Sequence, residues 1–187
     1  ATAHLASRRR LPPGAADEVI RLAASGGDAA LQQSMLDEVR RSTTPQIRRR
    51  FLFALAGFSR TPLLRTTLRA TLDRKLAPSV DRASLVMLLL SSPENAAPTW
   101  EHLQKVWPRL EREMPPILLA RVAEATSAAL PPSAAPSIRA FFRAHPLAAG
   151  SRVIRQVGEE LSITGQVQRL AGADLATLLR ESTLAPK

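Results

Sequence analysis

The sequence contains no cysteine and no tyrosine, and only three of its 26 basic residues are lysines. Without cysteine, the chain holds neither a disulfide framework nor a cysteine-ligated zinc ion. No run of about 18 apolar residues occurs, which argues against a membrane-spanning helix, and no apolar signal-type segment follows the arginines at positions 8–10. Abundant alanine, arginine, proline and leucine favour a GC-rich bacterial source, and we expect a cytoplasmic rather than an exported chain.

The motifs of the common catalytic sites are also missing. There is no HExxH zinc helix, no P-loop, no GxGxxG and no GxSxG. The three histidines, His4, His102 and His145, have no partner at a metal-binding spacing, and we expect surface or capping positions for them. Adjacent acids on one helix point in different directions, so we expect them to be solvated; the close pairs are Glu111 with Glu113 and Glu159 with Glu160. We therefore expect no catalytic residue, no metal ligand and no cofactor in this chain.

What the sequence has in quantity is regularly spaced proline. A length of 187 residues with 45% hydrophobic residues is enough for one core. Proline suits the first turn of a helix, and six of the 15 prolines, at positions 45, 62, 78, 98, 115 and 132, are separated by 17, 16, 20, 17 and 17 residues. One helix per spacing gives antiparallel pairs of about 35 residues, which is the scale of helical repeats. The sequence predicts an all-α, right-handed, HEAT- or armadillo-like α-solenoid of about nine to eleven helices. We expect a flexible basic segment at 1–12 and a single helical-repeat domain at 13–187.

The residues between these prolines have helical periodicity and no sustained alternation. Apolar residues recur three or four positions apart in stripes such as Leu31–Met35–Val39, Ile47–Phe51–Leu55–Phe58, Leu64–Leu68–Leu72, Trp100–Leu103–Trp107–Leu110 and Val153–Val157–Leu161, the last extending to Val167 and Leu170. The segment 84–91 is apolar almost all round, so we expect a central helix with contacts on two sides. We expect Pro108 to kink its helix or to end it near Trp107.

The positive charge is concentrated in one part of the chain. Residues 40–82 hold eleven basic residues and two acids, a net charge of +9, against +10 for the whole sequence. Arg48, Arg49 and Arg50 lie within this part. The helical wheel turns Arg49 away from the stripe of Phe51, while Arg48 and Arg50 flank the stripe. This pattern is compatible with three roles. The arginines could be solvated with their stems over the core, could bind a peptide carboxylate, or could contact the phosphates of a nucleic acid.

Three blocks of the sequence resemble one protein family. They are RRRFLFALAGFSRTPLLRTTLRATLD at 48–73, TWEHLQKVW at 99–107 and SIRAFFRAHP at 137–146. Their order and spacing resemble the C-terminal helical domain of the zinc aminopeptidases typified by puromycin-sensitive aminopeptidase and the endoplasmic-reticulum aminopeptidases. The chain departs from that pattern around Asp81, where only the acid is kept, and at Pro108. The HExxH helix and the Gly-x-Met-Glu-Asn motif of the catalytic part are absent.

The resemblance implies a non-catalytic solenoid that caps the active-site chamber of a bacterial zinc aminopeptidase and accommodates its peptide substrate. It implies the catalytic domain of the same parent chain as partner, with zinc in that missing domain and no activity in the isolated chain. Arg49, with Arg48 and Arg50, is then a candidate for binding the substrate peptide; no specific nucleic acid and no membrane are expected. The alternatives are a basic HEAT-like nucleic-acid-binding module and a protein–protein scaffold.

Overall fold

In the computed structural model, residues 13–147 and 151–184 are described, and the basic segment predicted at 1–12 lies outside them. The described residues form nine α-helices and three short 3-10 helices without a strand, as predicted. The α-helices are α2 (Pro13–Ser25), α3 (Ala29–Arg41), α4 (Pro45–Ala54), α5 (Thr61–Ala70), α6 (Ser79–Leu90), α7 (Pro93–Glu113), α8 (Pro116–Glu124), α9 (Ala135–Ala144) and α10 (Ser151–Leu184). The 3-10 helices are η1 (Leu55–Gly57), η2 (Ala125–Ser127) and η3 (Pro132–Ala134).

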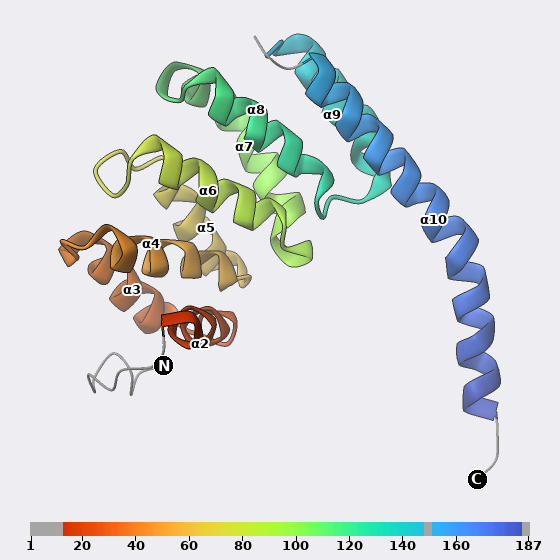
Figure 1. The fold of residues 1–187 in the computed structure, drawn as a ribbon, viewed down its shortest axis with the longest axis horizontal. Helices are drawn as coiled ribbons and strands as arrows, with labels where there is room; N and C mark the ends of the chain where they lie inside the picture. The colour runs from red at the N-terminus through yellow and green to blue at the C-terminus, as the bar shows by residue number, and fades with distance from the viewer. Residues whose placement is uncertain (1–12, 148–150, 185–187) are drawn as a thin grey trace.

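Helices two apart in the chain, such as α4 and α6, pack side by side, and consecutive helices such as α3 with α4 and α6 with α7 pack across, so the stack has two layers. One layer runs through α2, α4, α6, α8 and α10, each of which packs against the next, and α3, α5, α7 and α9 lie behind it (Figure 1). The final helix, α10, packs along α8 and α9 and then continues past them (Figure 1). This layered stacking of helix pairs is the arrangement of a helical-repeat protein.

Helix α6 is central, as its composition predicted, because its opposite sides belong to two different hydrophobic clusters. Leu85 and Leu89 pack with residues of α2 to α5, whereas Ala83, Val86 and Leu90 pack with residues of α7 to α10. No residue belongs to both clusters. A helix that is apolar all round therefore forms the boundary between the two cores.

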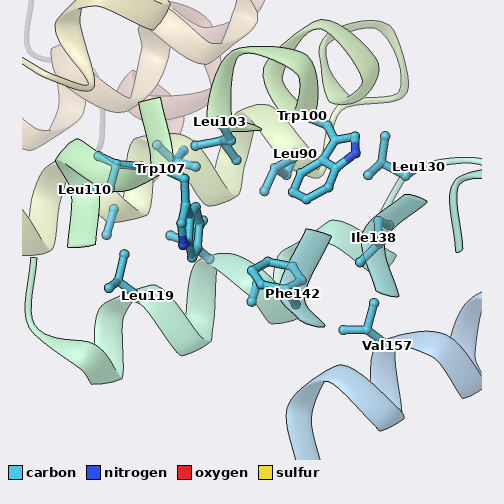
Figure 2. Packing of buried hydrophobic residues seen from close by; sticks show 14 of the residues in the cluster. Leu90, Trp100, Leu103, Trp107, Leu110, Leu119, Leu130, Ile138, Phe142 and Val157 are labelled. Carbon is cyan, nitrogen blue, oxygen red and sulfur yellow. The ribbon is translucent and has the colours of Figure 1, made fainter. Parts of the chain in front are cut away.

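The second cluster is built around four aromatic rings. Trp100 and Trp107 of α7 meet Phe141 and Phe142 of α9, with ring centroids 5.1 to 5.8 Å apart, mostly edge to face. Figure 2 shows the two tryptophans above Phe142, with leucines of α6, α7 and α8 around them. Edge-to-face contacts of this kind stabilise a core beyond the area they bury. The sequence blocks that contain these four residues therefore pack against each other.

Helix starts follow the sequence signals in part. Asp28 caps α3, since its Oδ1 accepts a hydrogen bond from the backbone N–H of Leu31 at 2.9 Å. Pro45 lies in the first turn of α4, as predicted. The helix expected to begin near Pro98 begins instead at Pro93, and the expectation that Pro108 ends it near Trp107 is wrong. Helix α7 runs to Glu113 because its buried stripe continues past Pro108, which lies on the exposed side.

Two apolar stripes are shorter than the sequence suggested. Ile47 is exposed although Phe51 and Leu55 of the same stripe are buried. On α10, Val157 and Leu161 are buried, whereas Val167 and Leu170 are exposed. Leu161 and Leu170 are nine positions apart, which places them on opposite sides of a helix, so this stripe does not extend along α10.

Candidate functional site

The three consecutive arginines predicted as a site lie in the middle of α4 and have three different environments. Arg49 is the most exposed, with 51% of its side chain accessible, and Arg50 is largely covered. Arg50 donates from Nε to Oδ1 of Asp17, which ties α4 to α2. The Nε of Arg48 is buried without a hydrogen-bond partner among the described residues. The structure thus spreads these side chains around α4 and does not gather them into one pocket.

Arg49 is held in place by a carboxylate on the next helix of its layer. Its Nε donates to Oδ1 of Asp81 on α6 at 2.8 Å, and only 4% of the Asp81 side chain is accessible. Within the described residues this is the only hydrogen bond of the guanidinium. Because Asp81 is buried and Arg49 is half-exposed, the pair fixes the base of the guanidinium and leaves its Nη groups without a hydrogen-bond partner within the described residues.

A second ion-pair network lies on the other side of α6. Arg82, with 3% of its side chain accessible, donates from Nη1 to the carbonyl of Thr71 at 3.2 Å and to Oε2 of Glu113 at 3.3 Å. Arg109 donates to Oε1 of the same Glu113 at 2.8 Å and to the carbonyl of Leu72 at 2.9 Å. The hydrogen bond from Arg109, with the charges of both arginines, lowers the pKa of Glu113 against the opposing effect of burial.

This network corrects the expectation that the acid pair Glu111 and Glu113 is merely solvated. Glu113 joins α7 to Arg82 of α6, and Glu111 accepts a hydrogen bond from Nε1 of Trp107 at 3.0 Å. Glu111 also lies 3.7 Å from Nδ1 of His145, which ends α9. The sequence did not predict these contacts of Glu111 and Glu113. The signal it offered was the pair of opposite charges, Asp81 and Arg82, next to the apolar part of α6.

His102 is not the surface histidine that its spacing suggested. It is half-buried on α7, and its Nε2 has no hydrogen-bond partner in the part of the chain that the structure describes. Burial, with a smaller effect of the Lys105 charge, lowers its pKa. Burial therefore favours the neutral form of His102.

The described residues contain no cluster of metal ligands. Over the ranges given above, no three histidine, aspartate or glutamate side chains are grouped closely enough to hold a metal ion. None of the described helices is long and apolar enough to cross a membrane.

These observations define a class of protein: an all-helical repeat domain whose central helix, α6, is joined to α4 and α7 by ion pairs through its buried Asp81 and Arg82. The family model of the ERAP1-like C-terminal domain matches residues 2–162. That match covers most of the sequence, and the chain belongs to this family, the C-terminal domains of ERAP1-like aminopeptidases. No curated protein matches the chain.

Proposed function

We propose that this chain is the chamber-capping, substrate-accommodating domain of a zinc aminopeptidase. Membership of the ERAP1-like C-terminal domain family carries the proposal. The parent chain supplies the catalytic domain, which holds the zinc and performs hydrolysis. The present chain supplies a surface and positive charge that accommodate the peptide. The isolated chain does not hydrolyse aminoacyl-anilide substrates.

Arg49 is the residue that we propose for binding the far carboxylate of a peptide. The support for Arg49 is its geometry: its side chain is half-exposed, Asp81 holds Nε, and the Nη groups make no hydrogen bond within the described residues. A guanidinium fixed in this way loses less side-chain entropy when an anion binds than a free arginine does. Arg48 and Arg50 are weaker candidates, because Arg50 already binds Asp17 and the Nε of Arg48 is buried.

Steady-state kinetics of the full-length enzyme test this function with peptides of increasing length. A charge-assisted hydrogen bond to a carboxylate is worth roughly 1.5–3 kcal/mol, so Arg49→Ala should raise KM for long peptides about tenfold or more. Dipeptide-sized substrates, which do not reach Arg49, should be nearly unaffected.

Arg65→Ala is the matched control, because Arg65 is also exposed but lies on α5 in the other layer. It should leave KM unchanged at every length. Asp81→Asn should reproduce part of the Arg49→Ala effect, since it releases the anchored Nε. An Arg49→Ala enzyme with unchanged KM for all peptide lengths contradicts the role of Arg49.

A further inference from the structure

The two hydrophobic clusters meet at α6. The two helices of the other layer that flank α6, α5 and α7, contribute to different clusters. The apolar side chains of α5, Leu63, Leu64 and Leu68, all belong to the first cluster. Those of α7, which include Trp100, Leu103 and Leu110, all belong to the second. Although α5 and α7 are neighbours, no buried apolar side chain of α5 belongs to the second cluster, and Leu72, just after α5, packs against that cluster only partly buried.

The side of α7 that faces α5 is polar along almost its whole length. Asn95 Nδ2 donates to the carbonyl of Ala56 in η1, the element that precedes α5, at 2.9 Å. Arg109 Nη2 donates to the carbonyl of Leu72, just after α5, at 2.9 Å. These two contacts fix which side of α7 faces α5. The residues on that side, three or four positions apart, are Asn95, Thr99, His102, Val106, Arg109 and Glu113.

The middle of this seam is the least satisfied part of the described structure. Thr99 Oγ1 and His102 Nε2 are buried without a hydrogen-bond partner in the described chain, and so is Oδ1 of Asn95. Polar groups in this condition gain hydrogen bonds when water reaches them, whereas apolar surfaces lose stabilisation when they separate. Opening the α5–α7 seam is therefore easier than separating either helix from its own cluster.

We propose that the α5–α7 seam is a hinge line within the solenoid. Helices α2 to α5 and helices α7 to α10 move as two bodies about α6, which stays packed against both through its apolar sides. The ion pairs of Asp81 with Arg49 and of Arg82 with Glu113 retain α6 on each body while the seam opens and closes. This motion changes the width of the stack without exposing either core.

Distances between paired spin labels test the hinge directly. The sequence has no cysteine, so introduced cysteines are labelled uniquely. One pair, Arg65→Cys on α5 with Glu101→Cys on α7, spans the seam, and all label sites are exposed. Control pairs lie within each body: Gln33→Cys with Arg65→Cys, and Glu101→Cys with Ser137→Cys. The seam pair should give a distance distribution about twice as broad as the controls.

A second set of variants changes the residues of the seam itself. Thr99→Val with His102→Leu makes the seam apolar and should narrow the seam-pair distribution to the width of the controls. Thr126→Val, which replaces a buried threonine of η2 away from the seam, should leave it broad. The hinge proposal is wrong if, with Thr99 and His102 unchanged, the seam pair gives a distance distribution as narrow as the controls. It is also wrong if a folded double variant keeps a broad distribution.

Discussion

Arg82 donates a hydrogen bond to Glu113 from a position where 3% of its side chain is accessible, against 15% for the carboxylate that receives it. The pair joins the central helix α6 to the end of α7, and Arg109 closes the network from the outside. A buried charge without its partner is costly, so this contact holds the two helices in one arrangement.

The first prediction concerns that network. Glu113→Gln removes the charge that compensates Arg82, and we expect it to lower the free energy of unfolding by about 3 kcal/mol. Chemical denaturation measures the change. Glu124→Gln is the control, because Glu124 is exposed on α8 and makes no ion pair among the described residues, so it should change stability by no more than about 0.5 kcal/mol. Equal stabilities of the two variants would contradict the structural role of Glu113.

Acid should weaken the same contact. The folded state lowers the pKa of Glu113 below the ordinary value of 4.5, chiefly through the hydrogen bond from Arg109. A lowered pKa means that the unfolded chain takes up the proton at a higher pH than the folded chain does. The stability that ionised Glu113 contributes is therefore fully present above pH 4.5 and is lost as pH falls through the folded pKa. Unfolding of the Glu113→Gln variant should show a weaker loss over this range than the parent chain shows.

His102 should make stability pH-dependent in a higher range. Burial lowers its pKa below 6.5, so the folded chain binds fewer protons than the unfolded chain as pH falls past that value. Stability should therefore be fully present above pH 6.5 and decline below it, toward the folded pKa. His102→Leu should show a smaller decline in thermal midpoint. His145→Gln, at the end of α9, should keep the decline that His102 causes.

Close packing of α2 against η1 predicts unequal effects of two glycine substitutions. A Cβ on Gly57 would lie 2.9 Å from Cβ of Ala24 and 3.0 Å from the carbonyl oxygen of Arg21, whereas a Cβ on Gly26 meets nothing within 4 Å. Gly57→Ala should destabilise the chain by about 1–3 kcal/mol through overpacking. Gly26→Ala should be neutral or stabilise it by up to about 1 kcal/mol. Thermal unfolding compares the two, and a tolerated Gly57→Ala would show that η1 is not tightly packed.

Trp107 should dominate the aromatic cluster. It is fully buried, it contacts both Phe141 and Phe142, and its Nε1 donates to Glu111. Trp107→Ala should cost about 3–5 kcal/mol in denaturant unfolding, because a large cavity remains. Ile117→Ala removes an exposed apolar side chain of α8 and should cost far less. Similar costs for both would mean that the cluster collapses around the cavity.

Much of the fold could be predicted because it depends on local patterns. Proline at helix starts, the Asp28 cap and the apolar spacing of Trp100, Leu103 and Trp107 each follow from neighbouring residues in the chain. Such patterns set where helices form and which side is buried. They failed at Pro98 and Pro108, because burial of a continuous stripe outweighed the loss of single hydrogen bonds within α7.

The surroundings of the candidate arginines were predictable only in part. The helical wheel picked Arg49 as the arginine turned furthest from the core, which agrees with its exposure. It gave no indication of Asp81, which is 32 residues away along the chain. Which acid meets which arginine depends on how α4, α6 and α7 are stacked, and no local spacing contains that information.

By itself, the sequence determined an all-helical repeat architecture, a central helix apolar on every side, and the family to which the chain belongs. These depend on periodicity and on short blocks of residues. Only the tertiary structure decided that the core divides at α6, that Glu113 holds a buried arginine, and that α7 turns a polar side toward α5. The physical reason is that burial and pairing are properties of contacts between helices, and those contacts join residues far apart in the chain.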